Sequence, residues 1–109
     1  VKIRNALESI AGIEVVAPTK AANPAYWVCL LVVTRKAELL NYLKKMDIRV
    51  SGLHQDNSDY TCFANSMIGE SRKLERINND IIAVPCGWWV SDLDVIHMIE
   101  LIKKFYSQQ

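Results

Sequence analysis

A run of β-branched, aromatic and aliphatic residues from Tyr26 to Thr34 does most to limit how this chain can fold. Because apolar side chains follow one another here without polar alternation, the run predicts a central strand that is buried on both faces of a sheet. The longest apolar stretch, Ala25 to Val33, is about half as long as a transmembrane helix. We therefore expect a globular domain built on a sheet, with no membrane partner.

Apolar residues at helical spacing predict four helices around this strand. They cover residues 2–10, Arg35–Met46, Ser71–Asn78 and a last segment that begins at Ser91. The sequence Ser91-Asp92-Leu93-Asp94 has the form of a capping box, which satisfies free amides at a helix start. We expect Leu74 and Ile77 to face inward. The core face of the last helix is expected to carry Val95, Met98, Ile99, Ile102 and Phe105.

Three further strands are expected, at residues 12–16, Asp47–Ser51 and Ile81–Pro85, with a short helical turn at Tyr60–Asn65. These elements combine into a small sheet with helices packed on it, an α+β fold or a two-layer α/β sandwich. The strands are too few for a doubly wound sheet. We expect residues 1–109 to form a single domain.

Composition excludes several classes of function. The chain has 13 basic and 12 acidic residues and a net charge of +1, which recruits neither nucleic acid nor an anionic membrane. The four glycines are isolated from one another, so no phosphate-binding loop can be written. Two histidines and three cysteines lack ligand spacing, and we expect no metal site.

The cysteines indicate a reducing compartment. Their number is odd and they form no C-x-x-C pair, which is typical of a cytoplasmic protein with free thiols. Cys29 lies in the expected central strand and should be inert. Of the other two, Cys86 is expected to be more exposed than Cys62. No base marks a nucleophile beside either, and His97 is interpreted as a partly buried or surface histidine of the last helix.

The loop from His54 to Tyr60 is the better of two candidate binding segments. It combines an imidazole, two carboxylates, two amides, two hydroxyls and an aromatic ring, and it follows an expected strand. Loops beyond strand ends often carry binding groups. The alternative is a solvated turn in which Asp and Asn side chains bond their own backbone.

The second candidate segment is the pair Trp88-Trp89. Neighbouring residues on an extended backbone point to opposite sides, so we expect one ring to pack under the last helix and the other to face a partner. The alternative is that both rings pack in the core.

Read in order, these segments resemble the C-terminal domain of the DegT–StrS family of sugar aminotransferases. The resemblance covers nearly the whole chain. The chain is similar to a branch of this family that has a Ser-x-x-His-x-Arg-Asn-Asp-x-Tyr-x-x-Phe stretch. Five residues match this stretch: Ser51, His54, Asn57, Tyr60 and Phe63. The most specific part of the resemblance is the segment from Pro85 to Trp89, which matches an Ile-Pro-x-Gly-Trp-Trp pattern.

The resemblance implies a small, mostly antiparallel sheet with helices, as in the small domain of fold-type I pyridoxal phosphate (PLP) enzymes. Family members are usually dimers that transfer an amino group to a nucleotide-linked keto sugar. Their cofactor lysine belongs to a large domain, which this chain lacks. His54, Asn57 and Tyr60 would be substrate-side contacts, and Trp88 and Trp89 interface residues. The resemblance implies no catalytic or cofactor-binding residue here, so the isolated chain should be inactive.

Two positions depart from the family pattern. Asp56 stands where the branch has arginine, and Ser58 where it has aspartate. Arginine binds phosphate or carboxylate through two donors, whereas aspartate repels both. Three readings stay open: the small domain of such an enzyme, a free-standing interaction or dimerisation module derived from it, and a small ligand-binding protein.

Overall fold

In a computed structural model, the described residues form a four-stranded sheet and four helices, three of which cover one face of that sheet. The structure describes residues 2–65, 69 and 72–108. In chain order the elements are α1 (Lys2–Leu7), β1 (Ile13–Val15), β2 (Cys29–Val33), α2 (Lys36–Lys45), β3 (Ser51–Gly52), the 3₁₀ turns η1 (Asn57–Asp59) and η2 (Thr61–Phe63), α3 (Arg72–Asp80), β4 (Ile81–Val84) and α4 (Asp92–Ser107).

The sheet has the strand order β1-β2-β4-β3, and every pair of neighbours is antiparallel. In the register, Cys29 of β2 lies opposite Val84 of β4, and Ser51 of β3 lies opposite Ala83. The predicted α+β fold with a small antiparallel sheet is confirmed, and β2 is an interior strand as expected.

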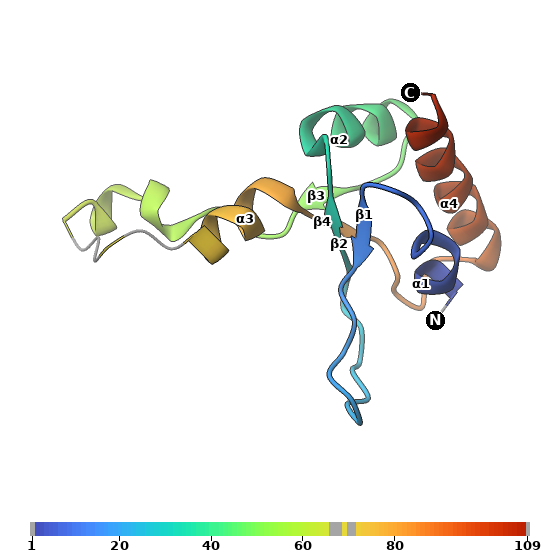
Figure 1. The fold of residues 1–109 in the computed structure, drawn as a ribbon, viewed down its shortest axis with the longest axis horizontal. Helices are drawn as coiled ribbons and strands as arrows, with labels where there is room; N and C mark the ends of the chain where they lie inside the picture. Colours follow the sequence, from blue (N-terminus) through green and yellow to red (C-terminus); the bar gives the residue numbers. More distant parts are fainter. Residues whose placement is uncertain (1, 66–68, 70–71, 109) are drawn as a thin grey trace.

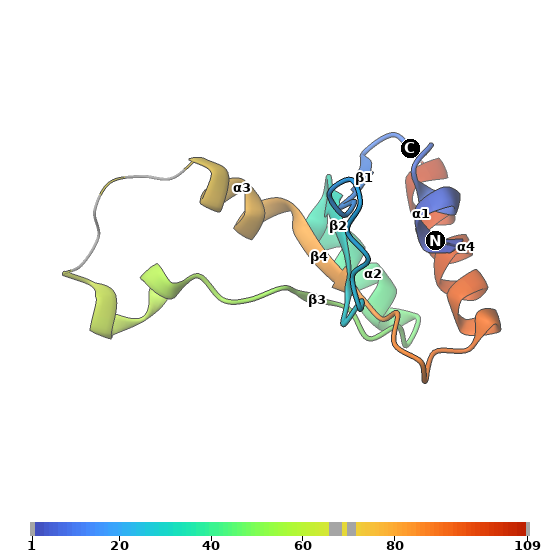
Figure 2. The ribbon, with the colours of Figure 1, turned by 90° about the horizontal axis from the view of Figure 1, so that it is seen from below.

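One face of the sheet carries the core. Cys29, Leu31 and Val33 of β2 are buried there, whereas Leu30 and Val32 on the opposite face are only half-buried. Helices α1, α2 and α4 lie on the buried side (Figures 1 and 2), and their apolar residues join the strand residues in one cluster. The prediction that β2 is buried on both faces is therefore wrong.

Strand β2 is also shorter than the apolar run that predicted it. It begins at Cys29 because β4 ends at Val84, directly opposite, and supplies no partner for the residues before it. Tyr26 and Trp27 consequently lie outside the ladder and are exposed.

Helix α4 matches its prediction closely. Ser91 Oγ accepts a hydrogen bond from the amide of Asp94 at 3.1 Å, and Asp94 Oδ2 accepts one from the amide of Ser91 at 3.1 Å. This reciprocal pair is the capping box read from the sequence. Of the five residues expected to face the core, Met98, Ile99, Ile102 and Phe105 are buried and Val95 is half-buried.

The strand predicted at Asp47–Ser51 is wrong for its first four residues, because the end of α2 uses the amides of the first two. The amide of Asp47 donates to the carbonyl of Lys44, and the amide of Ile48 donates to that of Leu43. These two bonds form a Schellman motif, with Asp47 in the left-handed region at φ 60°. Pairing with β4 begins only at Ser51.

Replacing Asp47 with glycine should therefore stabilise the chain. The left-handed conformation costs a non-glycine residue about 1–2 kcal/mol, and a carboxylate near a helix C-terminus opposes the helix dipole. We expect Asp47→Gly to raise the free energy of unfolding by about 1 kcal/mol, measured by urea denaturation followed by circular dichroism.

Arg35 provides the matched control for this substitution. It is also left-handed, at φ 56°, but its guanidinium lies 4.6 Å from the centroid of the Phe105 ring and is paired with Glu38. Arg35→Gly should gain nothing, because it removes those contacts. Equal stabilisation by both substitutions would contradict the assignment of strain to Asp47.

Two stretches project away from the sheet, as Figures 1 and 2 show: residues 16–28 between β1 and β2, and residues 53–65 together with α3. Turn η2 lies where a short helical turn was predicted. Leu74 and Ile77 were expected to face inward from α3, but their exposed fractions are 47% and 43%. That prediction is wrong because α3 projects from the sheet and contributes no residue to the described core cluster.

Candidate functional site

The loop that follows β3 borders a cavity of about 390 Å³ at the base of the longer projecting segment. His54 and Asn57, two of the three predicted substrate contacts, both line this cavity. Tyr60 does not line it; its side chain is 47% exposed between η1 and η2. The full lining is Lys36, Leu53, His54, Gln55, Asp56, Asn57, Leu74, Ile77 and Asn78.

His54 is held beside an aromatic ring. Its imidazole stacks on the indole of Trp27, with the ring centroids 6.4 Å apart and the ring planes 30° apart. Both side chains are exposed. The contact joins the two projecting segments, so a ligand at His54 would also alter the surroundings of Trp27.

Asp56 shapes the loop from inside. Its Oδ1 accepts a hydrogen bond from the amide of Ser58 at 2.8 Å, and its Oδ2 accepts one from the side-chain amide of Asn78. For this residue, the alternative of a turn that bonds its own backbone describes the structure. Asp56 ties the start of η1 to the end of α3.

Lys36 belongs to the same site, although the sequence reading did not single it out. Its ammonium donates to the backbone carbonyl of Asn78, and its side chain is half-buried. Strands β2 and β3 both pair antiparallel with β4, so they end at the same sheet edge. That topology places Lys36, just after β2, beside the loop after β3.

The hydrogen bonds to Asp56 predict a pH-dependent loop. The amide of Ser58, then its hydroxyl, and then the Asn78 amide hold the pKa of this carboxyl below its ordinary value of 3.8. A lowered pKa means that the stabilisation is complete above pH 3.8 and is lost as the pH falls through the folded pKa. We expect the Ser58 amide proton resonance to titrate with a midpoint below 3.8.

Asp56→Asn is the control for that titration, because it keeps the size of the side chain and removes the ionisable group. The Ser58 resonance of this variant should not move over the same acidic range. A resonance that titrates equally in both proteins would show that another group controls this amide.

The two adjacent tryptophans lie on the surface. Trp88 is 94% exposed and Trp89 is 62% exposed, so neither the packing of one ring under α4 nor the packing of both in the core occurs. The rings meet edge to face at 5.9 Å. A Cβ at Gly87 would lie 2.3 Å from the Trp89 ring, so the indole folds back over this glycine instead of entering the core.

The cysteines differ from expectation in one respect. Cys29 is buried in β2 as predicted, but Cys62 is exposed and Cys86 is only half-buried, which reverses the predicted order. Cys62 lies in η2 on a projecting segment, whereas Cys86 follows β4 against the core. His97 is a surface residue of α4, as interpreted.

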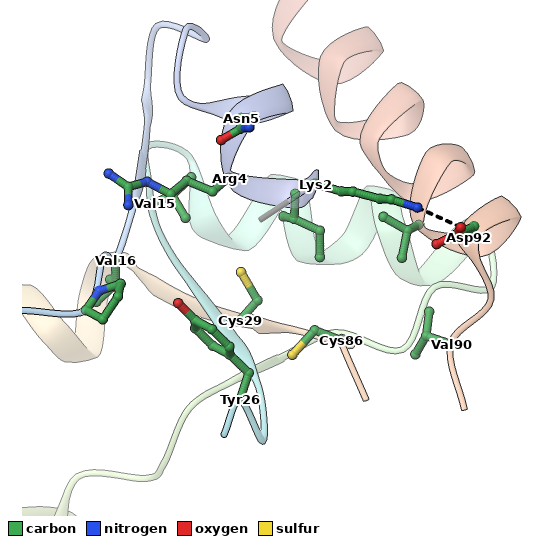
Figure 3. Close-up of a pocket in the computed structure, with 13 residues that line it drawn as sticks. Lys2, Arg4, Asn5, Val15, Val16, Tyr26, Cys29, Cys86, Val90 and Asp92 are labelled. Atoms are coloured by element: carbon green, nitrogen blue, oxygen red, sulfur yellow. Dashed lines mark hydrogen bonds and ion pairs between the residues drawn. The ribbon is translucent and has the colours of Figure 1, made fainter. Parts of the chain in front are cut away.

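A second, larger cavity of about 460 Å³ lies between α1, the starts of β2 and α4, and the residues after β4. Figure 3 shows that it is bordered by Tyr26, Cys29 and Cys86 and by the ion pair of Lys2 with Asp92. In the part of the chain that the structure describes, no three histidine, cysteine or acidic side chains gather as metal ligands. No helix among these residues has the length and apolarity to span a bilayer.

Solved structures of sugar aminotransferases match this fold over nearly the whole chain. The sugar aminotransferase CalS13 from Micromonospora echinospora is 25% identical, with a TM-score of 0.88 over 94% of this chain. The chain has the fold of the small domain of sugar aminotransferases. A DegT DnrJ EryC1 StrS aminotransferase from Brucella abortus (16% identity, TM-score 0.86, 96% of this chain) shares the fold of this small domain.

The aminotransferase PseC of Helicobacter pylori, which acts in pseudoaminic acid biosynthesis, also has this fold, with 12% identity and a TM-score of 0.86 over 98% of this chain. The resemblance read from the sequence is confirmed at the level of the fold. The small domain spans 28% of the CalS13 and Brucella chains and 30% of PseC. No protein-family model and no curated protein matches it.

Proposed function

We propose that this chain is the small domain of a PLP-dependent nucleotide-sugar aminotransferase that acts in amino-sugar or polysaccharide biosynthesis. The observation that carries the proposal is the match to sugar aminotransferases over 94% of this chain but only 28% of theirs. Catalysis would require a large domain outside these residues. Three free cysteines support a cytoplasmic location.

The lysines that line the cavities do not fit the cofactor. A Schiff-base lysine needs an available, desolvated amine. Lys2 is exposed, with its Nζ 2.6 Å from Asp92 Oδ2, and Lys36 donates to the carbonyl of Asn78. We therefore assign PLP to the large domain and derive no catalytic step from the residues of this chain.

The role we propose for the small domain is substrate contact. His54 and Asn57 offer an imidazole and an amide to the 390 Å³ cavity, and Tyr60 offers a phenol on the same projecting segment. These groups can bond sugar hydroxyls. Asp56 uses its carboxylate inside the loop, so it is not proposed as a substrate contact.

The flanking gene tests the proposal most directly. A reading frame that runs without interruption into Val1 and encodes a larger domain with a cofactor lysine would support it. The complete product should then show PLP absorbance that borohydride reduction fixes to that lysine. A start codon directly before Val1 would contradict the proposal.

A second function, self-association, is favoured by the 94% exposure of Trp88. An exposed aromatic side chain of this size is typical of a contact surface. In this reading the chain is a free-standing module that dimerises through Trp88 and Trp89. Light scattering after size exclusion should give a dimer that Trp88→Ser converts to monomer, while Trp27→Ser leaves it intact; a monomer at every concentration would exclude the module.

The third reading, a small ligand-binding protein, rests on the 390 Å³ cavity. Because Trp27 stacks on His54, ligand binding should change tryptophan emission. Titration with a nucleotide sugar should show this change in the unaltered chain and lose it in His54→Ala. No response at millimolar concentrations would leave the cavity without this role.

A further inference from the structure

Two thiols from different strands border the same cavity. Cys29 is the first residue of β2 and lies opposite Val84, the last residue of β4; Cys86 follows two residues later on the same chain segment. In an extended segment, residues two apart point to the same face. Figure 3 shows both side chains on the wall of the 460 Å³ cavity.

We propose that Cys29 and Cys86 form a dithiol site that reacts with small-molecule disulfides and closes into an intramolecular disulfide. Diagonal neighbours across a strand pair lie about 7–8 Å apart, which is farther than a disulfide allows, so closure needs a backbone movement. Here the second residue lies beyond the end of the ladder, where no strand hydrogen bond fixes its backbone. Closure therefore requires the segment after Val84 to carry Cys86 toward Cys29, and no ladder pairing opposes that movement.

The exposure of the two thiols sets the order of the reaction. Cys86 is half-buried, so its thiolate attacks a glutathione disulfide first; the mixed disulfide forms and one glutathione thiolate leaves. The thiolate of buried Cys29 then attacks the Cys86 sulfur and releases the second glutathione. The protein loses two thiol protons and two electrons, and one glutathione disulfide becomes two glutathione thiols.

The surroundings of the cavity make both steps slower at neutral pH than at alkaline pH. Burial, and then the charge of Cys86, raise the pKa of Cys29 to about 11, and burial raises the pKa of Cys86. Lys2 and Arg4 of α1, Asp92 of α4 and Tyr26 are the other charged or titratable groups on the cavity wall. A raised thiol pKa lowers the thiolate fraction, so closure should accelerate as the pH rises toward that of Cys29.

The test is incubation of the 109-residue chain with oxidised glutathione at neutral and at alkaline pH, followed by alkylation and peptide mass mapping. At neutral pH we expect mixed disulfides with glutathione at the exposed Cys62 and at Cys86. At alkaline pH we expect the mixed disulfide at Cys86 to be replaced by a peptide pair linked through Cys29 and Cys86. Disulfide closure should raise the urea midpoint of unfolding, and dithiothreitol should reverse the shift.

Matched variants keep the outcome unambiguous. Cys62→Ser removes the exposed thiol of η2 and should leave the closure intact, whereas Cys86→Ser should abolish it. Cys86 is preferred to Cys29 for this variant because its side chain is less buried. Three results would overturn the proposal. They are a disulfide between Cys62 and either other cysteine, a dimer linked through Cys86, and a mixed disulfide at Cys86 that persists unchanged at alkaline pH.

Discussion

Replacing Leu31 with alanine is expected to lower the free energy of unfolding by about 3–4 kcal/mol. Leu31 lies in the middle of β2, is fully buried, and belongs to the core that α1, α2 and α4 cover. A domain of ordinary stability unfolds with about 5–15 kcal/mol, so this loss removes a large part of the total. Urea denaturation followed by circular dichroism at 222 nm measures it.

Leu30→Ala is the matched control, since it changes the same residue type one position away. Leu30 points to the opposite face of the sheet and is only half-buried. Its truncation should cost about 1–2 kcal/mol, because it removes less buried area and leaves less of a cavity. Equal losses at both positions would contradict the one-sided core.

Gly12→Ala is expected to cost about 3 kcal/mol, for two reasons that add. Gly12 has φ +90°, a conformation that a residue with a Cβ adopts only under strain. A Cβ here would also lie 2.6 Å from Thr34 Oγ1 and 3.0 Å from the Tyr106 ring. That ring is fixed, because Tyr106 donates to the carbonyl of Thr34 at 2.6 Å. The same urea titration gives the loss.

Gly69→Ala separates the two contributions. Gly69 has φ +78°, but a Cβ there meets no atom within 4 Å. Its substitution should cost only the backbone strain, about 1 kcal/mol. The difference between the two glycines then measures the steric contact at Thr34 and Tyr106. A cost at Gly69 as large as at Gly12 would show that this contact contributes nothing.

Elements with local determinants could be predicted from the sequence. The capping box at Ser91 and Asp94 satisfies the start of α4 with residues three apart, so it is legible in the chain itself. The apolar stripe of α4 was likewise read correctly, because this helix lies on the core face of the sheet. The antiparallel pairing came from the family resemblance, since strand partners far apart in sequence leave no local signal.

The errors share one cause. Apolar residues predict that a segment is buried, but they do not predict which other segment covers it. Leu74 and Ile77 form a helical stripe, yet α3 projects from the sheet and leaves them exposed. Tyr26 and Trp27 continue the apolar run of β2, yet β4 ends before it can pair with them. The residues after Met46 alternate between polar and apolar as in a strand, yet the amides of Asp47 and Ile48 bond to carbonyls at the end of α2.

The substrate contacts stay a prediction, although the sequence did indicate part of the cavity lining. His54 and Asn57 do line one cavity, which follows from their place after a strand. Lys36 was missed because its neighbourhood depends on the strand order, which the local sequence does not encode. The sequence showed Asp56 as a departure from the family pattern, but its bond to Asn78, 22 residues away, needed the structure.

The contact between the first and last helices bears on how the chain folds as it is synthesised. Helix α1 packs on α4, and Lys2 pairs with Asp92 across 90 residues of sequence. During synthesis, the part of the core face that α4 covers therefore stays exposed until α4 has been made. We expect this face to become fully packed only after α4 has been made, because contacts between distant segments form late. A chain that ends before α4 should therefore expose apolar surface and aggregate instead of folding into a smaller domain.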